Sequence, residues 1–172
     1  MEENNQHALI VPAFKTLNEI RLTLNYTRVG ESRLLEAKSV SPINYSDLES
    51  CFNQAYRELK TNLAIVGDQI NKADVLVEKA KSDFLIDRYQ EKIKDLPKSY
   101  DSADLRKAWL MRDIDYTSAK DRLDMLKAME ALLDGKIKVF ERTCAFMKKQ
   151  MDLLLRSGLS GSQLYITNKG KE

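Results

Sequence analysis

Basic side chains gather toward the C-terminal end of the chain. Four of them share one stripe at helical spacing, interrupted by Asp152: Lys138, Arg142, Lys149 and Arg156. From residue 136 to residue 156, six basic side chains stand against two acidic ones, an excess of four positive charges. The helix macrodipole favours cations only in the last turn, whereas this excess spans several turns. The chemistry that such a stripe can do is phosphate binding, and the alternative is a solvated helix face.

A second basic group lies upstream, where Lys79 and Lys81 are followed by two further cations, Arg88 and Lys92. Three carboxylates dilute this group: Glu78, Asp83 and Asp87. The pattern alone therefore indicates a solvated helix face. The net charge of the whole chain is only +2, so binding to an acidic polymer must come from local clusters of this kind.

Residues for catalysis are sparse. The only histidine is His7, near the N-terminus, and no stretch resembles a phosphate-cradling glycine loop, a zinc cluster or a nucleophile elbow. Asp113 and Asp115 are two residues apart, and such a pair on a helix points to different faces, as on a solvated flank. Cys51 and Cys144 lack ligand-type spacing, and free thiols are typical of the cytosol. We therefore expect no enzymatic activity, no metal and no cofactor.

Two long stripes of apolar residues alternate at spacings of four and three, the pattern of a coiled-coil helix. The first comprises Phe52, Tyr56, Leu59, Leu63, Val66, Ile70, Ala73, Val77, Ala80 and Phe84. The second comprises Leu105, Trp109, Tyr116, Ala119, Leu123, Leu126, Leu133, Ile137, Phe140, Cys144, Met147, Met151 and Leu154, with Arg112 and Glu130 as the polar interruptions. Polar seam residues of this kind fix register and oligomeric state.

The two stripes predict an antiparallel helical hairpin over residues 46–156, with a turn near residues 96–101 that contains Pro97. The first helix is expected from a capping box at Ser46–Glu49 to about Asp95, and the second from about Ser102 to Arg156. Counting outward from the turn places residues whose numbers sum to about 197 opposite one another, for example Tyr56 and Phe140. Residues 157–172 are rich in glycine and serine and predict a flexible tail.

The N-terminal segment, residues 1–40, is ambiguous. Residues 31–38 predict a short helix that ends before Pro42. Residues 19–26 alternate polar and apolar side chains, which favours a strand or strand pair closed by Gly30. The same region also carries apolar residues at helical spacing, so a helix remains the alternative. The fold class predicted from these elements is all-α.

One hairpin leaves an apolar band on its second helix uncovered, formed by Met125, Met129 and Leu132 beside the seam. Further helices must cover such a band, so we expect a homo-oligomer. No apolar run is long enough to cross a membrane, and the N-terminus does not read as a secretory signal. We therefore expect a cytoplasmic protein without membrane contact.

The order of motifs from residue 31 to residue 155 resembles the UvsY-type recombination mediators of tailed phages. Residues 78–84, Glu-Lys-Ala-Lys-Ser-Asp-Phe, and the pair Asp113 and Asp115 after Trp109-Leu110 carry the resemblance, with Gly135, Ile137 and Arg142 further on. Proteins of that family are helical oligomers that bind single-stranded DNA, displace or remodel the single-strand-binding protein and load a RecA-like recombinase. The family's DNA-contacting motif falls on Lys79 and Lys81, although lysine replaces arginine at residue 81.

The resemblance implies an oligomeric, single-stranded DNA-binding recombination mediator. Its expected partners are single-stranded DNA, a RecA-like recombinase, the single-strand-binding protein and further copies of the chain, in the cytoplasm of the host cell if a phage encodes it. The expected DNA-binding residues are Lys79, Lys81, Arg88, Lys138, Arg142 and Lys149. The alternative is a coiled-coil scaffold or assembly chaperone without a nucleic-acid function.

Overall fold

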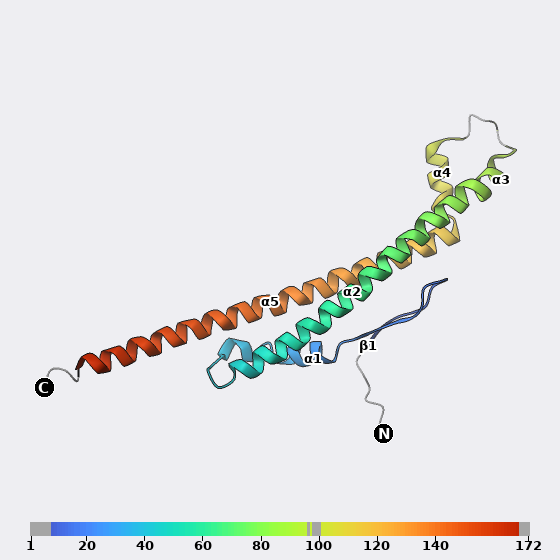
Figure 1. The fold of residues 1–172 in the computed structure, drawn as a ribbon. Coiled ribbons are helices and arrows are strands. Elements are labelled where there is room, and N and C mark those ends of the chain that lie inside the picture. Colours follow the sequence, from blue (N-terminus) through green and yellow to red (C-terminus); the bar gives the residue numbers. More distant parts are fainter. Residues whose placement is uncertain (1–7, 96, 98–100, 169–172) are drawn as a thin grey trace, which may run out of the picture. The chain divides into compact units, whose positions relative to one another are not determined.

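The computed structural model describes residues 8–95, 97 and 101–168, with side chains described as far as residue 157. Within this part the chain is mostly helical, and two long helices, α2 and α5, form a hairpin-like arrangement (Figure 1). The elements in chain order are β1 (Ala8–Val11), β2 (Ile20–Thr23), α1 (Asn25–Ser32), the 3₁₀ helix η1 (Glu36–Ser39), α2 (Tyr45–Asp83), the π-helix η2 (Phe84–Arg88), α3 (Tyr89–Ile93), α4 (Ala103–Leu110) and α5 (Ile114–Asn168). The predicted fold class, a long helical hairpin with a short N-terminal helix and strand pair, is confirmed.

The described residues divide into two compact units. Unit 1 contains residues 8–9, 22–62 and 134–168, and unit 2 contains residues 10–21 and 63–133. Both long helices contribute a segment to each unit, because the division falls within α2 and within α5.

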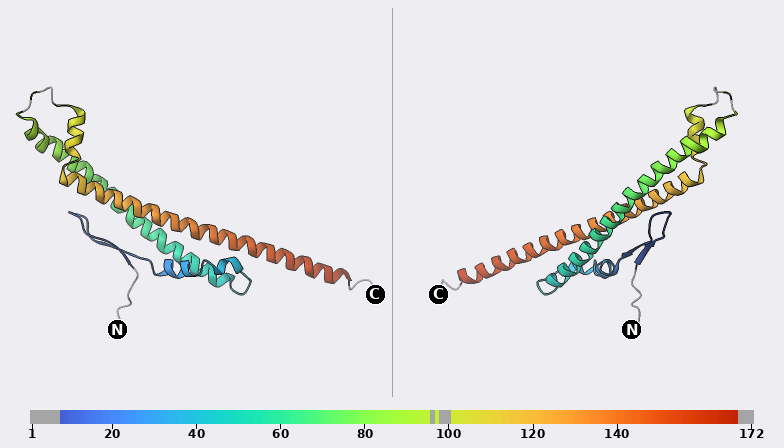
Figure 2. Two further views of the ribbon diagram at one scale, coloured as in Figure 1. Left: turned by 180° about the vertical axis from the view of Figure 1, so that it is seen from behind. Right: turned by 45° about the vertical axis from the view of Figure 1, so that its right-hand side comes forward.

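In unit 1 the first part of α2 packs against the second half of α5. Phe52 and Phe140 contact each other with ring centroids 5.7 Å apart. Helix α1 lies beside this part of α2 in both views of Figure 2. The other large side chains that are fully buried in unit 1 are Leu22, Leu48, Leu59, Ile137 and Met147. Burial of these apolar side chains is the main force that holds the segments of unit 1 together.

In unit 2 the core joins the second half of α2 to the first part of α5 and to the β1–β2 connection. Its buried apolar side chains are Val11, Leu17, Ile20, Val66, Ala73, Val77, Ala80, Phe84, Tyr89, Ala119, Leu123, Leu126 and Leu133. The rings of Phe84 and Tyr89 contact each other, with their centroids 6.0 Å apart. The N-terminal segment thus supplies apolar side chains to this core as well as a strand pair.

The predicted seam of α5 is confirmed where it is most apolar, from Ala119 to Met147, while the polar interruptions Arg112 and Glu130 are exposed. The seam of α2 differs from the heptad prediction, because Ala55 and Asn62 are buried where Tyr56 and Leu63 were expected, and those two are half-buried. Ten buried residues lie from Leu48 to Phe84 inclusive, and the half-buried pair Gln69 and Ile70 fills the turn between Val66 and Ala73. The thirty-six residues therefore contain ten turns, which is the 3.6-residue period of a straight α-helix.

The predicted register is wrong by about one helical turn, because Phe140 contacts Phe52, not Tyr56. The count from the turn assumed two uninterrupted arms. Instead the first arm contains the π-helix η2, and the second is broken at residues 111–113, between α4 and α5. Leu96 and residues 98–100 of the predicted turn lie outside the described part of the chain.

Several helix ends differ from those expected. Helix α2 begins at Tyr45, one residue before Ser46, and Glu49 accepts a hydrogen bond from Tyr45 Oη at 3.1 Å in place of the predicted capping box. Ser102 does cap α4, with its Oγ accepting from Leu105 N at 3.1 Å. Helix α5 continues to Asn168, beyond the expected end at Arg156, because glycine weakens a helix but no proline interrupts this stretch.

At the N-terminus the strand reading is confirmed at Ile20–Thr23, which pairs with Ala8–Val11 in a two-stranded antiparallel sheet. The short helix predicted at residues 31–38 is displaced, since α1 spans Asn25–Ser32 and η1 spans Glu36–Ser39. A contact between segments that are distant in sequence sets the start of α1, because the Glu58 carboxylate on α2 accepts hydrogen bonds from its first backbone amides. Among the described residues, none of the helices combines the length and apolar character that a membrane crossing requires.

Candidate nucleic-acid interface

The basic stripe of α5 lies in unit 1 and faces solvent. Lys138 forms an ion pair with Asp134 at 2.6 Å on the same helix. Arg142 and Lys149 are exposed, and within the described part of the chain neither forms an ion pair or a hydrogen bond. Two exposed cations about two turns apart on one helix, neither held in an ion pair, are available to an external anion such as phosphate.

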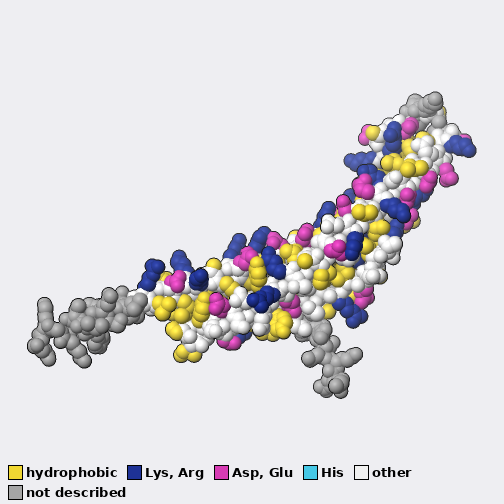
Figure 3. Space-filling view, in the orientation of Figure 1, with side chains coloured by type: hydrophobic (Ala, Val, Ile, Leu, Met, Phe, Trp, Pro, Cys, Tyr) yellow, Lys and Arg dark blue, Asp and Glu magenta, His cyan; other side chains and the backbone are white. Residues whose placement is uncertain are grey.

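An apolar ridge of exposed side chains accompanies these cations along α5. Its members recur every seven residues: Met125 and Leu132 in unit 2, and Val139, Phe146 and Leu153 in unit 1. Arg142 and Lys149 follow Val139 and Phe146 by three residues each, so they flank the ridge on the same helix. Figure 3 shows hydrophobic and basic side chains interspersed on the molecular surface.

A second cluster of cations lines a pocket of about 230 Å³ within unit 2, called here the Lys79 pocket. Its lining residues are Lys15, Thr16, Leu76, Lys79, Ala80, Asp83, Arg88 and Asp115. Lys79 and Arg88, both predicted from sequence as DNA-binding residues, therefore share one site. Lys81 is not among the lining residues and pairs instead with Glu78 at 3.5 Å.

An ion-pair network holds two of the three cations of this pocket. Arg88 Nη1 lies 2.7 Å from Asp113 Oδ2 and 2.9 Å from Asp115 Oδ2, and Lys15 Nζ lies 3.0 Å from Asp115 Oδ1. The hydrogen bond from Lys15, followed by the charge of Lys15 and the contact with Arg88, holds the pKa of Asp115 below its usual value. Lys79 forms no ion pair among the described residues, and Asp83, which lines the same pocket, forms none either.

The interpretation of Asp113 and Asp115 as a solvated flank is wrong for Asp113. Its side chain is only 9% exposed, and its Oδ1 accepts a hydrogen bond from Tyr116 N at 3.0 Å at the start of α5. Because Asp113 precedes the helix, the rule that places residues two apart on different helix faces does not apply. The two carboxylates converge on the Arg88 guanidinium.

Lys15 is a site residue that sequence reasoning missed. Lys15 lies in the segment that connects β1 to β2. Its backbone has a positive φ of 49°, a conformation that non-glycine residues adopt infrequently. Phe14 and Leu17 exchange two backbone hydrogen bonds of 2.8 Å around it. No charge pattern in the sequence indicates this residue, because only the folded connection brings it to Asp115 on α5, one hundred residues away.

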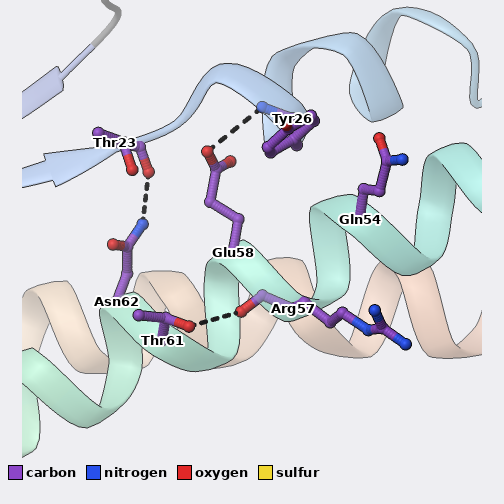
Figure 4. Close-up of a pocket in the computed structure, with 7 residues that line it drawn as sticks. All are labelled: Thr23, Tyr26, Gln54, Arg57, Glu58, Thr61 and Asn62. Atoms are coloured by element: carbon purple, nitrogen blue, oxygen red, sulfur yellow. Dashed lines mark hydrogen bonds between the residues drawn. The ribbon is translucent and has the colours of Figure 1, made fainter.

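Unit 1 contains a further pocket, of about 370 Å³, between the β2–α1 junction and α2. It is lined by Thr23, Tyr26, Gln54, Arg57, Glu58, Thr61 and Asn62, shown in Figure 4. Glu58 accepts hydrogen bonds from Tyr26 N at 3.3 Å and from Thr27 N at 2.7 Å, which satisfies the first amides of α1. This pocket, called here the Tyr26 pocket, was not anticipated from the sequence.

The chain matches no known family model, and neither its sequence nor its fold finds a match among curated proteins or solved structures.

Proposed function

We propose that this protein is an oligomeric mediator of recombination that binds single-stranded DNA, engages the single-strand-binding protein and helps to load a RecA-like recombinase. The observation that carries the proposal is the pair Arg142 and Lys149 on α5, exposed and without an ion pair in the described part of the chain. Exposed cations aligned on one helix bind successive phosphates without reading sequence, as a mediator on single-stranded DNA requires.

The Lys79 pocket supports the same proposal from unit 2. Its ion-pair network fixes Lys15 and Arg88, and Lys79 is left to contact a phosphate. The resemblance to the UvsY-type mediators assigns DNA contact to the motif that contains Lys79. Lys15 and Arg88 line the same pocket as that residue, together with Asp83 and Asp115.

Self-association is part of the proposal because two of the three residues of the predicted apolar band are exposed, while Met129 is half-buried. Met125 is 38% exposed and Leu132 is 54% exposed, and Val139, Phe146 and Leu153 continue the seven-residue spacing. An exposed heptad ridge on a long helix is typical of a coiled-coil interface. Arg142 and Lys149 then lie at the edge of the interface, where cations from several copies would form a longer phosphate-binding track.

The test is the affinity for a labelled oligonucleotide of thymidines at several salt concentrations, measured by fluorescence anisotropy. Each lost phosphate contact lowers the salt slope by about 0.7 for a single strand. The variants Arg142→Glu and Lys149→Glu should therefore bind more weakly and with a smaller slope. Lys38→Glu is the control, since Lys38 is an exposed cation of η1 that belongs to neither cluster.

The proposal is contradicted if the wild type binds no DNA. It is also contradicted if the protein that carries both Arg142→Glu and Lys149→Glu binds with unchanged affinity and salt slope. The exposed ridge favours one second candidate, a coiled-coil scaffold or assembly chaperone without nucleic-acid function. Such a protein would form a homo-oligomer in light scattering, lose it on Leu132→Glu, and show no salt-dependent affinity for DNA.

A further inference from the structure

We propose that the Tyr26 pocket of unit 1 holds one unstacked base of a bound single strand. This inference rests on the proposed function, because it names a contact of the same ligand at a place that neither basic cluster occupies.

The floor of the pocket is a closed hydrogen-bond frame. Glu58 accepts from the backbone amides of Tyr26 and Thr27 and from Thr27 Oγ1 at 2.8 Å. Asn62 donates from Nδ2 to Thr23 O at 2.6 Å, and Thr61 donates to Arg57 O at 3.0 Å (Figure 4). Thr27 and Asn62 are 1% and 3% exposed. The part-buried bonds of Glu58 with Thr27 and of Asn62 with Thr23 fix the junction of β2 and α1 on α2 before any ligand arrives.

The carboxylate of Glu58 does not make the pocket repellent to an anion. It accepts three hydrogen bonds and lies at the N-terminus of α1, where the helix macrodipole is positive. These contacts offset part of its negative charge. The outward-facing charge of the pocket is that of Arg57.

Three lining side chains have no bonding partner in the described part of the chain: Tyr26, Gln54 and Arg57. Tyr26 is 54% exposed, and its ring projects from α1 over α2, between Glu58 and Gln54 (Figure 4). The ring offers a stacking face, the Gln54 amide offers a donor and an acceptor, and the Arg57 guanidinium offers a positive charge.

A ligand that uses all three groups needs a flat π-face, a hydrogen-bonding edge and a neighbouring negative charge. A nucleotide within a single strand supplies them as its base face, its base edge and its phosphate, and the base is free because it has no paired strand. The volume of about 370 Å³ lies at the small end of ligand pockets and suits one base. Gln54 can satisfy several different base edges, so the contact should tolerate sequence.

The test compares two probes with the same backbone, a labelled thymidine oligonucleotide and an oligonucleotide of equal length with abasic sites throughout its centre. Loss of one base–aromatic stack lowers affinity about fivefold or more. Tyr26→Ala should therefore weaken binding to the thymidine probe at least about fivefold and leave the abasic probe unchanged, and Tyr26→Phe should bind both probes like wild type. Arg57→Ala should weaken binding to both probes, because it removes a phosphate contact.

The outcomes separate this inference from the proposed function. If wild type binds the thymidine probe with salt sensitivity but Tyr26→Ala binds it equally well, the base pocket is refuted and the mediator proposal stands. If wild type binds neither probe, both fail. Equal weakening of both probes by Tyr26→Ala would also refute the base contact, since a stacking residue cannot act on an abasic site.

A direct readout avoids dependence on folding of the variants. Photo-crosslinking of wild-type protein to an oligonucleotide that contains 5-iododeoxyuridine should attach the base to the peptide that contains Tyr26, identified by mass spectrometry. Adducts confined to other peptides would overturn the inference. Circular dichroism of each variant checks that the helical content is unchanged.

Discussion

Gly30 of α1 lies directly against the ring of Phe140 of α5, within unit 1. A Cβ atom built on Gly30 would lie 2.7 Å from Phe140 Cε1, closer than real Cβ atoms approach a neighbour, and 3.0 Å from Ala55 Cβ, which is a tight contact. The glycine is needed for space, because no glycine of the described residues has a positive φ. Its absent side chain lets α1 approach Phe140 of α5 and Ala55 of α2 closely.

Gly30→Ala should therefore lower the free energy of unfolding by about 1–3 kcal/mol, the usual cost of an overpacked core. The matched control is Gly67→Ala in α2, where an added Cβ meets nothing within 4 Å. That change should raise the free energy of unfolding by up to about 1 kcal/mol, because alanine favours a helix interior. Urea denaturation measures both, and equal stability of the two variants would contradict the close contact.

The sequence predicted the helical hairpin because its apolar periodicity is long and unambiguous. It also predicted most of the α5 seam, from Ala119 to Met147. The register of the hairpin and the seam of α2 could not be predicted by counting residues from the turn. The π-helix η2 and the break at residues 111–113 each change which residues of the two arms lie opposite one another. The start of α1 depends on Glu58, which is thirty-one residues from Thr27 in sequence and close to it only after folding.

The residues of the candidate interface could be predicted only where they share one helix. A cation stripe on one helix, such as Arg142 and Lys149, is visible in the sequence because helical spacing fixes which residues share a face. The Lys79 pocket combines side chains from three separate segments, and Lys15 joins it only through the β1–β2 connection. The Tyr26 pocket depends wholly on tertiary packing and left no pattern in the sequence.

Leu126→Ala should destabilise unit 2 strongly. Leu126 of α5 has no exposed surface, so the change removes buried methyl groups and leaves a cavity, at a cost of about 2–5 kcal/mol. Leu155→Ala on the same helix is the control, because Leu155 is 58% exposed. Its effect on the free energy of unfolding in urea should stay within about 0.5 kcal/mol. Similar effects of the two substitutions would show that Leu126 is not part of the core.

Asp115→Asn should change the pH dependence of stability. The contact with Lys15, and then that with Arg88, lowers the pKa of Asp115 below its usual value near 3.8. A carboxyl with a depressed folded pKa contributes stability above its usual pKa and loses that contribution as the pH falls through the folded pKa. The wild type should therefore be more stable than Asp115→Asn at pH 7, and the difference should disappear toward about pH 2.

Thermal unfolding at pH 7 and at pH 2 measures this difference. Asp124→Asn, an exposed carboxylate of α5 outside the ion-pair network, is the control and should alter unfolding little at either pH. A stability difference between wild type and Asp115→Asn that persists unchanged at the acid end would rule out the ion pair with Lys15 as its cause.

Cys51 and Cys144 should be close enough for a short bis-maleimide to link them within one chain. Both are half-buried free thiols of unit 1, and the contact of Phe52 with Phe140 brings their helix segments together. Burial, and then the charge of Glu49, raises the pKa of the Cys144 thiol, so its thiolate is scarce at neutral pH and air oxidation should be slow. Crosslinks found by mass spectrometry only between chains would mean that the α2 and α5 segments pair between subunits.

Arg122→Met should stabilise the protein. Arg122 of α5 is only 5% exposed, and its Nε and Nη2 have no hydrogen-bond partner among the described residues. Burial lowers the pKa of the guanidinium, which reflects the cost of holding a charge without a counter-ion in the core of unit 2. Methionine replaces the aliphatic part of the side chain and removes that charge, so the free energy of unfolding in urea should rise by about 1 kcal/mol or more. Arg122→Lys retains the charge and should bring no such gain, whereas a less stable Arg122→Met would reveal that the guanidinium has a partner that stabilises it.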